Sequence, residues 1–253
     1  MAQTDSLESR RILITGGAGG LAIPAVLEFL SLGADVAVLD RDRVKIAALQ
    51  EAAHGLPGTL TIKEVDLSNA TELRDVVTQL IREVGDFDTL INNAAIYPSK
   101  PFEEYSLDEY QLIQRVNVES AVICTQLLLP GMKAQEFGRI INITSITFSG
   151  GWENLSPYVG SKGTLLGLAR TWAREFGQHG ITVNCVAPGA FPTDAEKIHP
   201  DLAAYTNRII SSQAIKRRGI PADIVNALLF FISAESGFIT GQSLNVDGGW
   251  VMD

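Results

Sequence analysis

The sequence predicts an α/β fold, a single doubly wound parallel sheet with helices on both faces. Short apolar runs alternate with amphipathic segments of helical length along most of the 253 residues. The alternation continues without a linker or a change in composition, and no repeat shorter than a strand–helix pair occurs. Because strands that alternate with helices lie parallel and are covered on both sides, one domain over residues 1–253 is expected.

The composition is that of a globular protein with no preference for nucleic acid. Hydrophobic residues make up 46% and charged residues 19%, and the formal charge of −9 leaves no basic stripe for phosphate backbones. Cys124 and Cys185 lie far apart in apolar stretches, which predicts buried thiols in a reducing compartment. No apolar run of about 18 residues and no leader-like segment occurs. A cytoplasmic protein with no membrane partner is expected.

The first expected strand, residues 11–15, leads into a glycine-rich loop and then an amphipathic helical segment. Glycines let the backbone approach a pyrophosphate, and the free N–H groups of a helix N-terminus favour the anion. A glycine cluster alone is often only a turn, but a strand before it and a helix after it favour a phosphate site. The loop residues concerned are Gly16, Gly19, Gly20 and Leu21.

The second expected strand, residues 35–39, is followed by Asp40, which lies 24 residues after Gly16. An acid at this place in a dinucleotide-binding unit bonds the adenosine ribose hydroxyls, and its charge repels a 2′-phosphate. Arg41 comes next and could accept that phosphate instead. The sequence therefore favours NAD, with NADP as the alternative.

The later elements carry their own local signals. Ser106 and Glu109 have capping-box spacing and open a long helix. Pro221 is expected in the first turn of a helix, and residues 242–246 form a last short strand. Residues 190–214 break the alternation and are expected to form a mobile helical flap over a pocket. The other expected helices cover 42–54, 69–84, 106–129, 157–177 and 222–233, and the other strands cover 59–65, 89–92, 139–144 and 181–187.

Tyr158 and Lys162 stand four residues apart in the helix that Ser156-Pro157 is expected to open, so they share one face. A phenol with a pKa near 10 is a poor base at neutral pH, and an adjacent cation favours the phenolate. Ser145 ends the preceding strand, which could place its hydroxyl beside the phenol. Taken alone, the pair could equally be a surface tyrosine and lysine.

In combination, these residues resemble the classical short-chain dehydrogenase/reductase family from about Arg11 to Trp250. Their order and spacing are specific, although each piece alone is weak. Ala22 and Ala95 depart from the family pattern, which has glycine at both places. The matching pieces are Thr15-Gly16-x-x-x-Gly20, Asp40, Asp66-Leu67, Asn92-Asn93-Ala94, Asn117, Ser145, Tyr158-x-x-x-Lys162, Pro188-Gly189 with Thr193, and Thr240-Gly241-Gln242 through Asp247-Gly248-Gly249.

The resemblance implies a Rossmann-type sheet of about seven strands and hydride transfer between a nicotinamide cofactor and a secondary alcohol or ketone. It implies that Tyr158 is the general acid/base, that Lys162 lowers its pKa and holds the nicotinamide ribose, that Ser145 bonds the reacting oxygen, and that Asn117 supports a water relay. A homodimer or homotetramer is implied as well. The implied cofactor-binding residues are Gly16, Gly19, Gly20, Leu21, Asp40, Asp66, Leu67, Asn93, Tyr158, Lys162, Phe191 and Thr193.

Loops at the carboxyl ends of parallel strands bind ligands, so they supply the candidates for the substrate pocket beside Ser145 and Tyr158. Phe148 and Trp152 fit equally well as plugs of the local core. Aryl or cyclic alcohols, sugars or polyols and hydroxyacyl compounds all remain open. The four candidates are Tyr97, Phe148, Trp152 and Glu153.

The sequence leaves two other functions as alternatives to this interpretation. An NADPH-dependent carbonyl reductase is expected if Arg41 governs the ribose site. A catalytically silent NAD(H)-binding sensor or scaffold is disfavoured by the complete set of Asn117, Ser145, Tyr158 and Lys162. The three histidines have no second ligand within sequence reach, so no metal site is expected.

Overall fold

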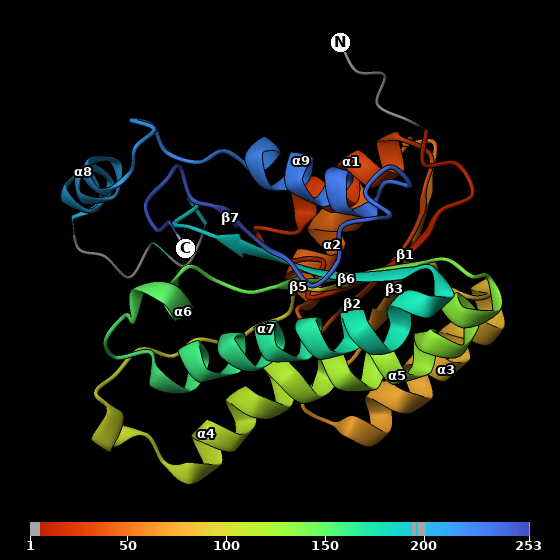
Figure 1. Ribbon diagram of the computed structural model, residues 1–253, viewed down its shortest axis with the longest axis horizontal. Coiled ribbons are helices and arrows are strands. Elements are labelled where there is room, and N and C mark those ends of the chain that lie inside the picture. The colour runs from red at the N-terminus through yellow and green to blue at the C-terminus, as the bar shows by residue number, and fades with distance from the viewer. Residues whose placement is uncertain (1–5, 194–195, 197–200, 253) are drawn as a thin grey trace.

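The computed structural model describes residues 6–193, 196 and 201–252, and its centre is a seven-stranded sheet of order β3-β2-β1-β4-β5-β6-β7 (Figure 1). Every neighbouring pair is parallel. The chain winds from β1 outward to β3 and then crosses back to β4, which confirms the predicted doubly wound α/β fold. The strands are β1 (Arg11–Thr15), β2 (Asp35–Asp40), β3 (Thr59–Glu64), β4 (Thr89–Asn92), β5 (Gly138–Ile143), β6 (Ile181–Pro188) and β7 (Ser243–Val246).

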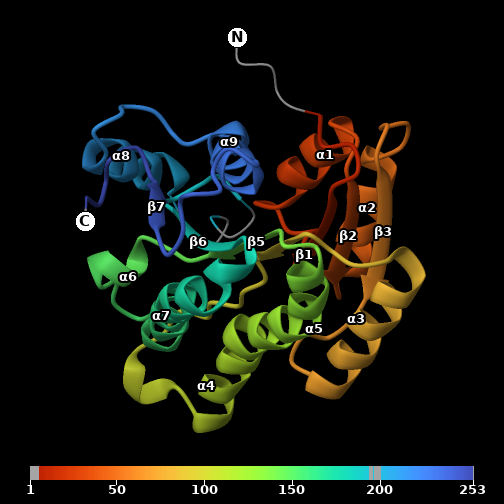
Figure 2. The same cartoon turned by 45° about the vertical axis from the view of Figure 1, so that its right-hand side comes forward.

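Helices cover both faces of the sheet, as Figures 1 and 2 show. One face carries α1 (Ile23–Ser31), α2 (Arg43–Ala52) and α9 (Pro221–Ile232). The other carries α3 (Ala70–Val84), α5 (Ser120–Ala134) and α7 (Ser156–Phe176). No helix among the described residues is both long and apolar enough to span a membrane.

The sheet separates two hydrophobic cores. In β1, Ile12 and Ile14 belong to the core under α1, α2 and α9, whereas Leu13 belongs to the core under α3, α5 and α7. Successive side chains of a strand point to opposite faces, so a strand covered on both faces must be apolar at every position. This explains why the strands appear in the sequence as continuous apolar runs.

The long helix expected over 106–129 consists of α4 (Leu107–Gln114), a π-helical turn at Arg115–Glu119, and α5. Ser106 and Glu109 form the predicted capping box. The predicted end near residue 129 is wrong, because α5 continues through Pro130 to Ala134. Its last turn packs closely, since a Cβ at Gly131 would lie 2.6 Å from the Asp86 carboxyl carbon.

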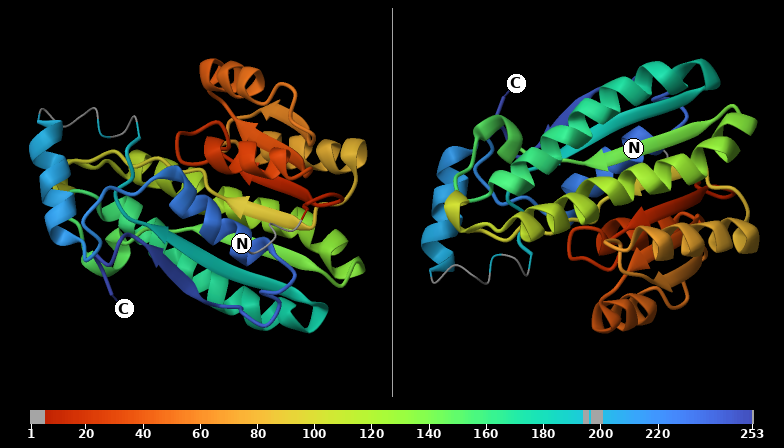
Figure 3. Two further views of the ribbon diagram at one scale, coloured as in Figure 1. Left: turned by 90° about the horizontal axis from the view of Figure 1, so that it is seen from above. Right: turned by 90° about the horizontal axis from the view of Figure 1, so that it is seen from below.

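The segment of the predicted flap contains α8 (Leu202–Ser212), while residues 194–195 and 197–200 lie outside the described part of the chain. Figures 1 and 3 show α8 at the end of the molecule toward which β6 points. The sequence did not predict the short helix α6 (Thr147–Gly150), which lies between β5 and α7.

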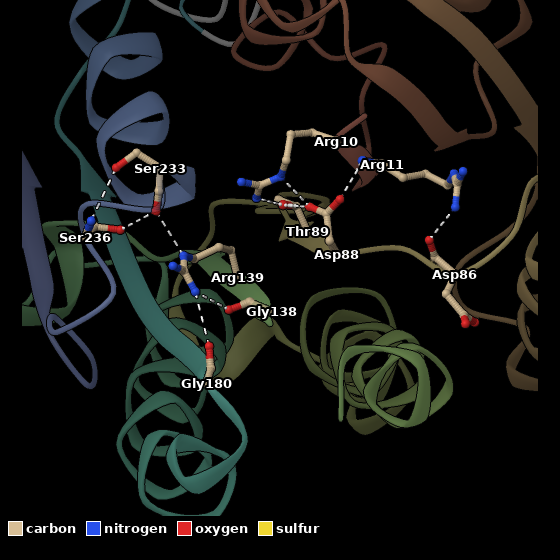
Figure 4. Close-up of polar contacts among 10 residues, drawn as sticks. All are labelled: Arg10, Arg11, Asp86, Asp88, Thr89, Gly138, Arg139, Gly180, Ser233 and Ser236. Atoms are coloured by element: carbon tan, nitrogen blue, oxygen red, sulfur yellow. Dashed lines mark hydrogen bonds and ion pairs between the residues drawn. The ribbon is translucent and has the colours of Figure 1, made fainter. Parts of the chain in front are cut away.

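A buried polar network joins β1 and β4 at the opposite, amino end of the sheet (Figure 4). Arg10 Nε donates to Asp88 Oδ1 at 2.8 Å, and Arg10 Nη2 donates to Thr89 Oγ1 at 2.8 Å. The backbone N–H of Arg11 donates to Asp88 Oδ2 at 2.7 Å. Asp88 therefore holds a guanidinium and a strand N–H at once.

Arg139 extends this polar network from β5 toward the end of α9 (Figure 4). Its guanidinium donates to the carbonyls of Gly138 at 2.9 Å, Gly180 at 3.3 Å and Ser233 at 3.1 Å. Both guanidiniums also pack against the ring of Phe137, whose centroid lies 4.6 Å from the Cζ of Arg10 and 4.1 Å from that of Arg139. These contacts fix the amino ends of the central strands, at the edge of the sheet opposite to their carboxyl ends.

Replacing Asp88 by alanine is expected to lower the free energy of unfolding by about 3 kcal/mol, because the Arg10 charge would stay largely buried without its partner. The side chains of Arg10 and Asp88 are only 16% and 9% exposed. Urea unfolding followed by tryptophan fluorescence measures the change. Glu64→Ala is the matched control: it breaks the exposed ion pair with Arg43 and is expected to cost at most about 1 kcal/mol. Equal losses for the two variants would contradict the assignment.

Candidate active site

A cavity of about 490 Å³ opens at the carboxyl ends of the strands, where the chain crosses from one half of the sheet to the other. Such crevices are the general ligand-binding place of open α/β sheets. The cavity brings together most of the predicted site residues from distant parts of the chain. Those that line it are Gly16, Gly19, Gly20, Leu21, Asp40, Asp66, Leu67, Asn93, Tyr97, Ser145, Tyr158, Lys162, Phe191 and Thr193.

The glycine-rich loop between β1 and α1 lies on one wall. Gly16 has a φ of +64°, and a Cβ there would lie 2.9 Å from the Ala94 Cα, so only glycine fits. A Cβ at Gly20 would lie 3.7 Å from Thr193, which shows how closely the loop after β6 approaches. Ala22, one of the two departures from the family pattern, is buried in the core and precedes the first turn of α1.

Charged side chains gather where β2 and β3 end. The Asp40 carboxylate accepts hydrogen bonds from the backbone N–H groups of Ala18 at 3.0 Å and Arg41 at 2.8 Å. The Ser68 backbone N–H chiefly lowers the pKa of Asp66, whose Oδ1 lies 3.9 Å from Arg41 Nη1. Arg41, the alternative partner of a 2′-phosphate, also lines the cavity. Asp42 and Lys45 line it too, although they were not expected as site residues. The signal for them was their position at the start of the helix directly after Asp40.

Asn93 joins the end of β4 to the glycine-rich loop. Its Nδ2 donates to the carbonyls of Thr15 at 3.1 Å and Gly16 at 2.9 Å. The Thr15 hydroxyl in turn accepts from the backbone N–H groups of Asn93 at 3.1 Å and Ala94 at 3.2 Å. These bonds fix the glycine-rich loop against the end of β4, the strand next to β1 in the sheet.

Asn117 lies in the π-helical turn and does not line the cavity. Its Oδ1 accepts from the Ile96 N–H at 2.8 Å, and its Nδ2 donates to the Ile96 carbonyl at 3.0 Å. The same Nδ2 donates to Ser161 Oγ on α7 at 3.0 Å. The Asn117 side chain therefore ties the segment after β4 to the helix that carries Tyr158.

Tyr158 and Lys162 meet Ser145 at the other end of the cavity. Burial raises the pKa of Tyr158, a hydrogen bond with the Ser145 side chain lowers it, and the nearby Tyr97 raises it. Lys162 Nζ donates to the Ile143 carbonyl at 2.6 Å and lies 5.5 Å from the Tyr158 ring centroid. Burial lowers the pKa of Lys162 to about 8. The predicted lowering of the Tyr158 pKa by Lys162 is therefore not found in this arrangement, in which desolvation dominates.

The four substrate-pocket candidates take different places. Tyr97 lines the cavity, and its ring meets that of Tyr158 edge to face, with centroids 5.7 Å apart. Phe148, Trp152 and Glu153 do not line it.

Phe148 and Trp152 pack elsewhere. A Cβ at Gly163 on α7 would lie 2.7 Å from the Phe148 ring. The ring of Trp152 packs edge to face against that of Trp250, with centroids 5.4 Å apart. Phe148 lies in the short helix α6 and Trp152 follows it, and this helix directs the chain away from Ser145. Their role and that of Glu153 in substrate binding stay predictions.

Comparison with known proteins agrees with this geometry. The family model described as enoyl-(acyl carrier protein) reductase matches residues 16–251. The 3-oxoacyl-[acyl-carrier-protein] reductase of Thermotoga maritima is 31% identical over 97% of this chain and 99% of its own. A subunit of the (2S)-[(R)-hydroxy(phenyl)methyl]succinyl-CoA dehydrogenase of Thauera aromatica is 34% identical over 96% and 97% of the two chains.

A solved structure shares the architecture over almost the full length. The gluconate 5-dehydrogenase from Burkholderia cenocepacia, in complex with NADP and tartrate, superposes with a TM-score of 0.90 and 28% identity over 98% of each chain. The family model covers far more than half of the sequence, and both curated relatives exceed 30% identity. This chain belongs to the classical short-chain dehydrogenase/reductase family and is an oxidoreductase of alcohols and ketones that uses a nicotinamide dinucleotide.

Proposed function

We propose that this protein transfers hydride between NAD(H) and a secondary alcohol or ketone, with Tyr158 as the general acid/base. The observation that carries the proposal is the position of the Tyr158 phenol in a cavity whose other end holds the glycine-rich loop and Asp40. A nicotinamide dinucleotide, when bound, accepts or supplies the hydride. The chain itself supplies position and proton transfer.

The described residues fit a dinucleotide. The glycine-rich loop leaves space that side chains would fill, and it precedes the N-terminus of α1, which favours a pyrophosphate. Asp40, Asp66, Leu67, Phe191 and Thr193 all line the cavity. We assign the first three to the adenosine end and the last two to the nicotinamide end.

Four residues divide the proton chemistry. Tyr158 takes the proton of the substrate hydroxyl during oxidation and returns it to the carbonyl oxygen during reduction. Ser145 bonds the same oxygen and the phenol, and Lys162 places a cation behind the Tyr158 ring. We assign Asn117 a positioning part, because its side chain is bonded to Ile96 and Ser161. Because these bonds occupy the Asn117 side chain, a water relay would run through groups near Asn117 and not through that side chain.

The charges near Asp40 support NAD over NADP. Arg41 lies 3.9 Å from the Asp66 carboxylate, and Lys45 lies 3.5 Å from that of Asp42, so both cations have acidic partners. Asp40 is then the uncompensated charge, and a 2′-phosphate would meet net negative charge. The rival, an NADPH-dependent reductase, requires Arg41 to leave Asp66, and the related dehydrogenase from Burkholderia cenocepacia was solved with NADP.

Replacing Asp40 by alanine is expected to lower the ratio of kcat/KM for NAD to that for NADP by about 10-fold or more, because the repulsion of the 2′-phosphate disappears. The ratio is measured from dinucleotide absorbance at 340 nm with one alcohol that the protein oxidises, found by screening a panel of alcohols. Asp75→Ala, an exposed acid on α3, is the control and is expected to leave the ratio unchanged. A wild-type preference for NADP would favour the Arg41 rival.

A second candidate function is a catalytically silent dinucleotide sensor. It would bind NADH, measured by dinucleotide fluorescence, and turn over no alcohol or ketone in a broad panel. The hydrogen-bonded and partly buried pair of Tyr158 and Ser145 beside the buried Lys162 favours the enzyme, since a buried cation destabilises the fold and is retained where it serves the chemistry.

We also propose that the protein forms a homotetramer or homodimer in the cytoplasm. Large apolar side chains are exposed on α4, α9 and the edge strand β7, where a second copy would cover them. The two cysteines are unbridged, as a reducing compartment requires. Light scattering at micromolar concentration tests the assembly. We also propose that residues 190–214, which include helix α8, form a flap over the substrate pocket. The exposed side chains concerned are Leu107, Tyr110, Leu112, Phe230 and Leu244.

A further inference from the structure

The charges along the cavity are distributed unevenly. Among the described lining residues, the ionisable side chains of Asp40, Arg41, Asp42, Lys45 and Asp66 all lie at the adenosine end. The reacting end has only Lys162, which is 1% exposed and donates to the Ile143 carbonyl. A carboxylate or phosphate of a substrate beside Tyr158 would therefore meet no available cation among these residues, and such a charge is costly to desolvate unpaired.

Polar groups for a polyol are also scarce at the reacting end. The Thr144 hydroxyl donates to the Val186 carbonyl at 3.1 Å, and Ser145 accepts from Thr147 Oγ1 at 2.9 Å besides bonding Tyr158. Apart from the hydroxyls of Thr193, Tyr97 and Tyr158, the remaining walls at this end are apolar or backbone. A sugar would lose more hydrogen bonds to water there than these hydroxyls replace. The apolar and backbone walls are Ala95, Ile96, Val116, Ile143, Pro188, Gly189 and Phe191.

Tyr97 adds a flat apolar surface directly beside the acid/base. Its ring is half exposed, at 50%, and stands at 62° to the ring of Tyr158. A planar ring on the reacting carbon could pack against this exposed surface while its oxygen reaches the Tyr158 phenol. Aromatic contacts of this kind add about 0.5–1.5 kcal/mol beyond the buried area, and a saturated ring of equal size does not gain them.

We infer that the substrate is an uncharged secondary alcohol, or the corresponding ketone, with an aromatic ring on the reacting carbon, and that Tyr97 determines this preference. The inference rests on the proposed function, because it concerns the same site. In the reducing direction the carbonyl carbon receives the hydride of the reduced dinucleotide, and the carbonyl oxygen receives the proton of Tyr158. The alcohol and the oxidised dinucleotide leave.

The test compares three methyl ketones of similar size with NADH: acetophenone, cyclohexyl methyl ketone and 4-acetylbenzoate. Acetophenone is expected to exceed cyclohexyl methyl ketone in kcat/KM by about 2- to 12-fold. It is expected to exceed the carboxylate by at least about 100-fold. Tyr97→Leu is expected to reduce the first ratio to about 1, and Tyr97→Phe to preserve it. Phe102→Leu, an exposed aromatic residue outside the cavity, is the matched control and is expected to preserve it too.

The outcomes separate this inference from the function on which it rests. Equal rates for the three ketones, a ratio that survives Tyr97→Leu, or Tyr158-dependent reduction of 5-keto-D-gluconate but not of acetophenone would overturn the inference alone. If NADH binds and no ketone is reduced, the proposed function fails. Equilibrium binding of acetophenone to the NADH complex then decides the inference: binding weakened by Tyr97→Leu supports it, and no such binding overturns it.

Discussion

Replacement of Tyr158 by phenylalanine is expected to lower kcat by about 10²–10⁴-fold, because the group that exchanges a proton with the substrate oxygen is removed. Dinucleotide binding is expected to change little, since the glycine-rich loop and Asp40 lie at the other end of the cavity. Turnover is measured with an alcohol that the wild type oxidises, and binding is measured by NADH fluorescence. Tyr110→Phe on α4 removes an exposed phenol outside the cavity and serves as the control.

The pH dependence of turnover, compared between the wild type and Tyr158→Phe, is a second test of the role of Tyr158. Burial raises the pKa of Tyr158, so the phenol is protonated at neutral pH and the phenolate fraction grows as pH rises. Oxidation, which needs the phenolate, is expected to accelerate from neutral toward alkaline pH, and reduction, which needs the phenol, to slow. The residual activity of Tyr158→Phe should lack both slopes. Wild-type turnover in the variant would remove Tyr158 from the mechanism.

Replacement of Lys162 by methionine is expected to abolish most turnover and yet stabilise the fold at pH 7. Burial lowers the pKa of Lys162 from 10.5 to about 8, which corresponds to about 3 kcal/mol of lost unfolding free energy while the group is charged. Methionine is similar in shape and needs no solvation, although the Ile143 carbonyl loses its donor. A net gain of about 1–3 kcal/mol is expected from urea unfolding.

The sign of this effect changes the pH profile in a definite way. The folded-state pKa is below the unfolded one, so the unfolded chain binds the Lys162 proton more tightly between about pH 8 and 10.5. The penalty is complete below about pH 8 and disappears as pH rises through that window, and the advantage of the variant should shrink with it. Lys45→Met, a half-exposed lysine on α2, should show no such trend. A variant less stable than wild type at pH 7 would contradict the burial argument.

Much of the fold could be predicted from local signals. Strands buried on both faces appear as continuous apolar runs, and the Ser106 capping box marks a helix start through bonds between near neighbours in sequence. The end of α5 could not be predicted in this way. The helix continues through Pro130 to Ala134, and its last turn packs closely against Asp86, which is distant in the sequence.

The glycine-rich loop and Asp40 could likewise be predicted, because their spacing follows from a single strand–loop–helix unit. The neighbours of Tyr158 could be predicted only in part, because Ser145 and Tyr97 lie beside it as expected but two other candidates do not. Phe148 and Trp152 lie between Ser145 and Tyr158 in the sequence, and adjacency suggested a shared pocket. The short helix α6 directs them to Gly163 and Trp250 instead.

The sequence by itself thus determined the order of the elements, the family and the choice of Tyr158 and Lys162 as the proposed acid/base pair, since each depends on residue types at short spacing. Only the tertiary structure decided what surrounds that pair. Burial dominates the pKa values of Tyr158 and Lys162, Asn117 is bonded to Ile96 and Ser161, and Tyr97 alone of the four substrate candidates lines the cavity. The physical reason is that desolvation and side-chain contacts arise between segments that only folding brings together.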